Sequence, residues 1–149
     1  MRRALVVCAV LLAACASGEK PADTVAAAPA VPPPPAPISL ADVAGTWDVK
    51  AMPMDRDTVL STSQTVATGT MEGWKLMIDG KTYPTKVLTV SGDSITTETG
   101  PFPSVLRKGQ QVTVHNILRM KNGKMVGVIH ARYANGDTAT LRVEGTRTQ

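Results

Sequence analysis

Residues 111–144 read QVTVHNILRMKNGKMVGVIHARYANGDTATLRVE. Two Asn-Gly dipeptides interrupt this stretch, Asn122-Gly123 and Asn135-Gly136, and apolar residues alternate with polar ones on either side of them. Asn-Gly is favoured in tight turns between antiparallel strands, because both residues tolerate a left-handed backbone. The stretch therefore predicts three antiparallel strands joined by two hairpins. The strands are expected at 110–120, 124–133 and 138–146.

The same turns predict which residues face each other. A two-residue turn in the first hairpin places Val114 opposite Ala131 and His115 opposite His130. In the second hairpin such a turn would direct the polar side of the last strand inward, so a three-residue loop with Gly136 left-handed at a bulge is predicted instead. The side chains expected to face inward are Val112, Val114, Asn116, Leu118, Met120, Met125, Ile129, Ala131, Tyr133, Ala139, Leu141 and Val143. The outward set includes Thr113, His115, Arg119, His130, Arg132, Thr140, Arg142 and Glu144, and it leaves the apolar Ile117, Val126 and Val128 outside.

Segments upstream of this stretch are rich in Val, Thr and Ile and are separated by turn residues, which predicts further strands. These strands are expected at 45–51, 58–67, 72–78, 84–90 and 94–99, with an extended run at 103–107 continuing into 110–120. Residues 39–149 contain eleven glycines and no long segment with a helical period. Eight strands with turns at short intervals are typical of an antiparallel up-and-down barrel or of a sandwich.

The first residues of the chain have the composition of a secretory signal. Arg2 and Arg3 precede a short apolar run, which is too short to span a bilayer, since a spanning helix needs about 20 apolar residues. The following Leu12-Ala13-Ala14-Cys15 resembles the lipobox of bacterial lipoproteins, and an ordinary small-residue cleavage site is the alternative. The resemblance implies a signal peptide over 1–14 and an acylated Cys15, for example with palmitate. Because Ala16 rather than aspartate follows, it also implies the periplasmic face of the outer membrane.

Residues 15–38 are expected to form a tether rather than a folded segment. They hold seven of the eleven prolines, including the run Pro32 to Pro35, among small residues that cannot build a core. Such a sequence favours extended polyproline II geometry, which would let the tether reach up to about 70 Å from the membrane. The folded domain is therefore expected at 39–149.

Composition argues against several classes of function. Without residues 1–14 the chain has fourteen basic and twelve acidic residues and no run of Lys or Arg, so nucleic acid is not expected as a partner. Residues 39–149 lack cysteine, which excludes a disulfide framework and a thiol nucleophile there. They also lack the Gly-x-Ser-x-Gly, His-Glu-x-x-His and phosphate-loop motifs, so neither an enzyme nor a cofactor is expected.

The start of the domain carries a short motif. Ser39 and Asp42 form a helix-capping pattern, which predicts a single helical turn ending before Gly45. Gly45-Thr46-Trp47 then resembles the Gly-x-Trp signature of lipocalins and related calycins. This resemblance implies an eight-stranded barrel closed at one end by Trp47, with a basic residue of the last strand over its ring. Arg147 or Arg142 is the candidate for that role.

The resemblance implies a lipid-anchored envelope protein that binds or carries a small apolar ligand. The alternative is a filled barrel that acts as a protein-binding module, because a barrel of eight strands either holds one small ligand or is filled by its own side chains. The residues expected to contact a ligand are Trp74, Val114, Asn116, Leu118, Ile129, Tyr133 and Leu141.

Other motifs have two interpretations each. His115 and His130, if opposite each other, are close enough to share Zn²⁺ or Cu²⁺, but two ordinary surface histidines are the simpler interpretation.

The loop residues 52–57 occupy the place of the lipocalin lid. Phe102 lies between two prolines and is expected either to contact a ligand or to fold back as a plug. Methionines are expected to fill the core rather than to bind Cu(I).

Overall fold

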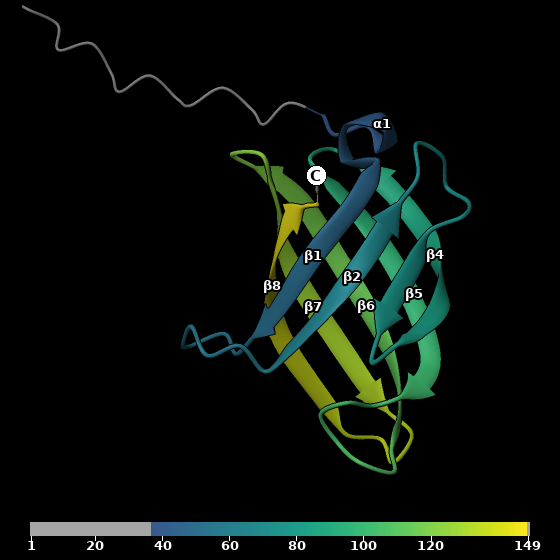
Figure 1. Cartoon of the computed structure of the whole chain (residues 1–149), viewed down its shortest axis with the longest axis vertical. Helices are drawn as coiled ribbons and strands as arrows, with labels where there is room; N and C mark the ends of the chain where they lie inside the picture. Colours follow the sequence, from purple (N-terminus) through teal and green to yellow (C-terminus); the bar gives the residue numbers. More distant parts are fainter. Residues whose placement is uncertain (1–36, 149) are drawn as a thin grey trace, which may run out of the picture. The chain divides into compact units, whose positions relative to one another are not determined.

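One short helix precedes eight antiparallel strands that close into a barrel (Figure 1). The computed structural model describes residues 37–148, so the predicted signal peptide, Cys15 and nearly all of the predicted tether lie outside the described residues. The elements are α1 (Leu40–Val43), β1 (Gly45–Met52), β2 (Ser61–Ala67), β3 (Lys75–Ile78), β4 (Lys81–Ser91), β5 (Ser94–Pro103), β6 (Gln111–Lys121), β7 (Lys124–Tyr133) and β8 (Thr138–Arg147).

The strand order is that of an up-and-down barrel. Each strand pairs with its neighbours in sequence, and β1 also pairs with β8, from Trp47 opposite Arg147 to Met52 opposite Arg142. This closure confirms the predicted all-β, eight-stranded fold and excludes the sandwich, which would have two separate sheets. The predicted N-terminal turn is confirmed as α1, capped by reciprocal hydrogen bonds between Ser39 and Asp42.

The two predicted hairpin registers are confirmed. His115 lies opposite His130, and Ala131 lies opposite Ala139 in the second hairpin. Asn122 and Gly123 both have positive φ, as the two-residue turn requires, and Gly136 has φ of 91° in a loop where its N–H donates to the carbonyl of Tyr133.

Several predicted strand boundaries are wrong. β4 begins at Lys81 rather than at residue 84, and β5 extends to Pro103 rather than ending at residue 99. Residues 104–110 form a loop instead of continuing β6, because the Ser104 hydroxyl accepts the N–H groups of Leu106 and Arg107. β3 begins at Lys75 rather than at residue 72, because the preceding turn is held by Thr68, whose hydroxyl donates to the carbonyl of Glu72. β2 begins at Ser61 rather than at residue 58.

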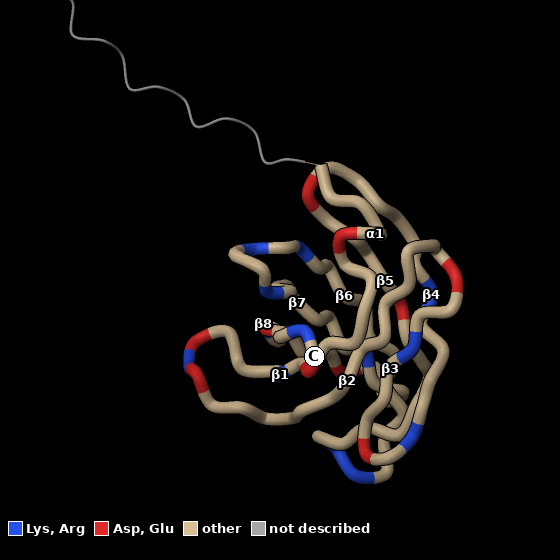
Figure 2. The backbone as a smooth tube through the Cα atoms, turned by 45° about the horizontal axis from the view of Figure 1, so that its top comes forward, with Lys and Arg blue, Asp and Glu red and all other residues tan. Residues whose placement is uncertain are grey.

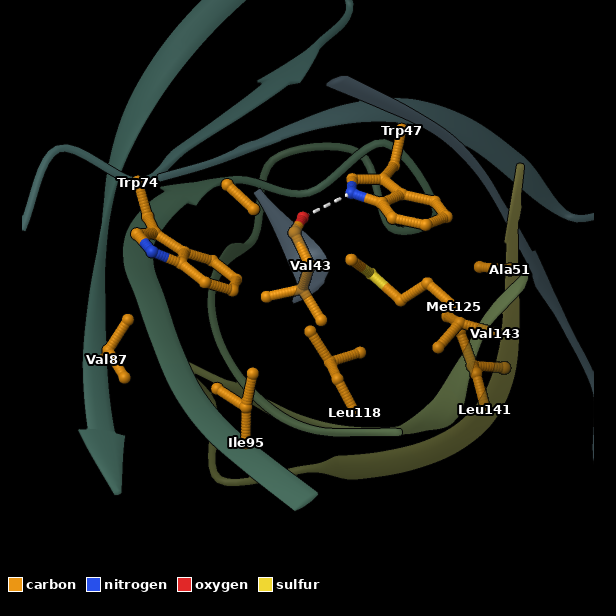
Figure 3. Packing of buried hydrophobic residues seen from close by; sticks show 11 residues of the cluster. Val43, Trp47, Ala51, Trp74, Val87, Ile95, Leu118, Met125, Leu141 and Val143 are labelled. Atoms are coloured by element: carbon orange, nitrogen blue, oxygen red, sulfur yellow. Dashed lines mark hydrogen bonds between the residues drawn. The ribbon is translucent and has the colours of Figure 1, made fainter. Parts of the chain in front are cut away.

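A buried cluster closes the barrel at the end that carries α1 (Figure 3). Trp47 is completely buried, and its indole N–H donates to the carbonyl of Val43 over 2.8 Å. Around it pack Trp74, from the loop before β3, and side chains from seven strands, among them Val87, Ile95, Leu118 and Met125. Because these side chains come from strands around the whole circumference, this end of the barrel is solid.

A second, smaller cluster lies toward the opposite end, which we call the mouth. It is formed by Phe102, Val112, Val114, Ala131 and Tyr133, and Tyr83 packs against it with its ring centroid 5.0 Å from that of Phe102. The loops 53–60, 104–110 and 134–137 connect strands at this end. The first of these carries the acid-base-acid run Asp55-Arg56-Asp57, which is visible as alternating red and blue in Figure 2.

Candidate functional site

The barrel encloses a cavity of about 90 Å³ between the solid end and the mouth. It reaches the surface beside Val105 and Leu106 of the mouth loop, which are 42% and 39% exposed. An engineered cavity of about 150 Å³ in another protein takes up benzene, whereas pockets for drug-sized ligands hold about 300–1,000 Å³. The cavity is therefore on the scale of one small molecule and not of a lipid with long acyl chains.

One side of the cavity is aliphatic. It is formed by β6, β7 and β8, whose inward residues alternate with outward polar ones as the hairpin registers require. The residues that line this side are Val112, Val114, Ile129, Ala131, Leu141 and Val143. Burying the apolar surface of a ligand against this wall removes that surface from water, which is favourable by about 25 cal/mol for each Å² of apolar surface buried.

The other side is lined by hydroxyl groups. These come from alternate positions of β2, β4 and β5: Ser61, Ser63, Thr65, Thr85, Thr97 and Thr99. The Oγ1 atoms of Thr85 and Thr99 lie 2.7 Å apart in a hydrogen bond across the β4–β5 pair. Asn116, on the neighbouring strand β6, donates from Nδ2 to Thr97 Oγ1 over 3.0 Å. We call Thr85, Thr97, Thr99 and Asn116 the polar wall.

The mouth loop 104–110 is attached to the β7–β8 hairpin by Arg107. The guanidinium lies over the ring of Tyr133, 4.2 Å from its centroid, and pairs with the carboxylate of Asp137. Hydrogen bonds from Asn135 and then from Arg107 lower the pKa of the Asp137 carboxyl, so the group is ionised at neutral pH. The loop is thereby held where Val105 and Leu106 complete the cavity wall.

The barrel wall has a gap between β2 and β3. The first three residues of β2, Ser61–Ser63, pair with β1 on one side but with no residue of β3 on the other. Pairing between β2 and β3 begins only at Gln64, which lies opposite Met77. A depression of about 510 Å³ lies beside this gap and shares Val49 and Ile78 with the lining of the cavity.

Six of the seven residues predicted to contact a ligand line the cavity: Val114, Asn116, Leu118, Ile129, Tyr133 and Leu141. The seventh, Trp74, does not. Its ring is buried in the cluster at the solid end, and its indole N–H donates to the carbonyl of Thr70 over 2.9 Å. Phe102 takes the inward of its two predicted positions, 4% exposed and stacked on Tyr83 at the cavity.

The hydroxyl groups of the cavity are absent from the sequence prediction. The available signal was Ser or Thr at every second position, at 61, 63 and 65 and again at 97 and 99, because positions two apart in a strand share a face, but Thr62 and Thr96 blur the pattern. Small hydroxyl residues in strands are as common on outer faces, so the pattern alone does not say that this face is inward.

At the solid end the structure places Arg147 over Trp47, with the guanidinium carbon 4.6 Å from the ring centroid. Arg147 also donates to the carbonyls of Asp42 and Ala44, which tie the last strand to α1. Gly45 has φ of 140°, and a Cβ there would lie 3.1 Å from the Arg147 guanidinium. Arg142, the other candidate, lies toward the mouth and donates to the carbonyls of Pro53 and Arg56.

The two histidines lie opposite each other on the outer face, and each has another partner. His115 Nε2 is 3.0 Å from Glu98 Oε2, and His130 Nδ1 is 3.3 Å from the hydroxyl of Thr140. Among residues 37–148, no group of three or more His, Cys, Asp or Glu side chains is arranged to hold a metal ion.

Comparisons of the chain with protein-family models, with curated proteins and with solved structures gave no match. In the part of the chain that the structure describes, no helix has both the length and the apolar composition needed to cross a membrane.

Proposed function

We propose that this protein is a lipid-anchored protein of the bacterial cell envelope that binds or carries one small, mainly apolar molecule inside its barrel. The single observation that carries the proposal is the cavity of about 90 Å³, which has a continuous aliphatic side and a route to the surface at the mouth. A barrel that serves only as a rigid scaffold gains stability by filling such a space, because voids in a core are costly.

Binding is tested with benzene, added to 15N-labelled protein of residues 37–148. This segment contains all eight strands and both buried clusters, and its barrel closes on itself, as an independently folding unit requires. We expect saturable shifts in the amide signals of residues that line the cavity. Ala131→Trp should abolish these shifts, because Ala131 is 6% exposed and its side chain faces the cavity.

The matched control is Ala134→Trp, which adds the same ring at an exposed position of the neighbouring loop and should leave benzene binding unchanged. Thermal unfolding of each variant checks that it is folded. If neither benzene nor the related probes described below cause a saturable shift in the unmodified domain, the carrier function is wrong, and a filled protein-binding barrel becomes the better hypothesis.

The anchor is tested in bacteria that express the full chain and are fed alkyne-tagged palmitate. We expect the mature protein to carry the label and to fractionate with the outer membrane. Cys15→Ser should lose essentially all of the label, because the other cysteine, Cys8, lies in the segment that the signal peptidase removes. The matched control is Cys8→Ser, which should keep the label in full. Equal labelling of the two variants would contradict acylation at Cys15.

A further inference from the structure

The interior of the barrel is two-sided in its chemistry. Most of the aliphatic lining residues lie on β6, β7 and β8, with others on β1 and β3, while the polar wall comes from β4, β5 and the adjoining position of β6. Thr97 and Thr99 are only 1% and 2% exposed, so these hydroxyl groups face the interior and not the solvent. A cavity that took only hydrocarbon would gain nothing from buried hydroxyl groups, since burying a polar group costs free energy unless it is hydrogen-bonded.

Every member of the polar wall has a hydrogen-bond partner within the wall, but none uses its full bonding capacity there. The Thr85–Thr99 bond uses one of the two hydroxyl protons, and the Asn116–Thr97 bond uses one of the two amide protons. A hydroxyl offers one proton and two lone pairs, and a primary amide offers two protons and a carbonyl oxygen. Donors and acceptors therefore both remain on this wall for a guest molecule.

The cavity carries no formal charge among the residues that the structure describes. Its lining contains no Asp, Glu, Lys, Arg or His side chain. The charged residues are spread over the strands and loops (Figure 2), and none of them lines the cavity. An ionised group brought into this space would lose its hydration without gaining a counter-charge, and that loss is far larger than the cost for a neutral polar group.

We infer that the cavity selects a small neutral molecule that joins a hydrocarbon body to one hydrogen-bonding group, such as a hydroxyl, carbonyl or amide. The hydrocarbon lies against β6, β7 and β8, and the polar group bonds to Thr97 and Asn116. Carboxylates and ammonium ions are excluded by the absence of a counter-charge. This inference rests on the proposed function and adds the class of ligand to it.

The test compares four probes of similar size at neutral pH: benzene, benzyl alcohol, benzoate and benzylammonium. Dissociation constants come from the amide shifts of the domain described above. We expect benzyl alcohol to bind at least about tenfold more tightly than benzoate or benzylammonium. Thr97→Val keeps the shape of the side chain and removes its hydroxyl, and should weaken binding of benzyl alcohol about three- to tenfold while changing that of benzene less than about twofold.

Two further variants keep the test decisive. Thr96→Val makes the same chemical change at the adjacent position, whose side chain is on the outer face of β5, and should change none of the four constants. If Thr97→Val unfolds the domain because the Asn116 amide loses its partner, the double variant Thr97→Val with Asn116→Leu removes both partners together, which proteins tolerate better.

The outcomes separate the two proposals. Selective binding of benzyl alcohol that is lost in Thr97→Val supports the inference. If benzene binds but the charged probes bind as tightly as benzyl alcohol, or if Thr97→Val leaves the binding of benzyl alcohol unchanged, the inference is overturned while the carrier function stands. If none of the four probes binds, the proposed function itself is overturned.

Discussion

Replacing Trp47 by alanine is expected to lower the free energy of unfolding by about 3–5 kcal/mol, the range measured for deletion of a buried aromatic side chain. Trp47 is completely buried and is packed between α1, Arg147 and the apolar cluster of the solid end. Its removal would leave a cavity at the end of the barrel and would free the carbonyl of Val43 from its hydrogen bond to the indole. The change is measured by urea unfolding, followed by far-UV circular dichroism.

Two control variants show how much of this loss of stability is due to the ring and the N–H group of Trp47. Trp47→Phe keeps much of the ring but removes the N–H group, so it should cost less than the alanine variant. Lys50→Ala changes an exposed residue of the same strand and should shift the free energy of unfolding by no more than about 0.5 kcal/mol. A loss below about 1 kcal/mol in Trp47→Ala would contradict the role of Trp47 in closing the barrel.

A single added methyl group at Gly127 is expected to cost about 3 kcal/mol or more in the free energy of unfolding, at the upper end of the range for overpacking. Gly127 lies opposite Leu118 in the β6–β7 hairpin, and a Cβ at this position would lie 2.2 Å from the backbone oxygen of Ile117. The clash is with backbone and not with a flexible side chain. Gly127→Ala therefore forces the two strands apart.

The matched control is Gly69→Ala. Nothing lies within 4 Å of a Cβ at Gly69, and the backbone there is not in the left-handed region, so the same substitution should be nearly neutral. Urea unfolding of both variants gives the comparison, and amide spectra report whether the hairpin is displaced. Equal stability of the Gly127 and Gly69 variants would show that β6 and β7 do not approach as closely as described.

The hairpins were predictable because their determinants are local. The Asn-Gly turn at Asn122-Gly123 sets the register of β6 and β7 within a few residues of itself, and every later pair follows from alternation. The loop 104–110 was not predictable in the same way. It depends on backbone N–H groups of the loop that donate to the Ser104 hydroxyl and on Arg107 reaching Asp137, thirty residues further along the chain.

The candidate site was predictable on one side only. Apolar residues at alternate positions of β6 to β8 indicated an inward face, so Val114, Ile129 and Leu141 were identified before their positions were known. Asn116 was predicted to face inward, but the three threonines of the polar wall were missed, because Thr97 and Thr99 have the residue types of an outer face. Which face of β5 is inward depends on its pairing with β6, from Ser94 opposite Arg119 onward, and no tight turn of recognisable sequence sets that register.

The seam between β1 and β8 has a consequence for the order of folding. Every other strand pair joins neighbours along the chain, whereas this one joins residues 90 to 100 positions apart, such as Trp47 and Arg147. Pairing across so long a loop carries the largest entropic cost and is typical of late steps. The barrel can thus assemble as a row of hairpins, but its two outer strands keep unpaired edges until the C-terminal strand is available. A chain that lacked β8 would keep those edges open and would be prone to associate with other chains.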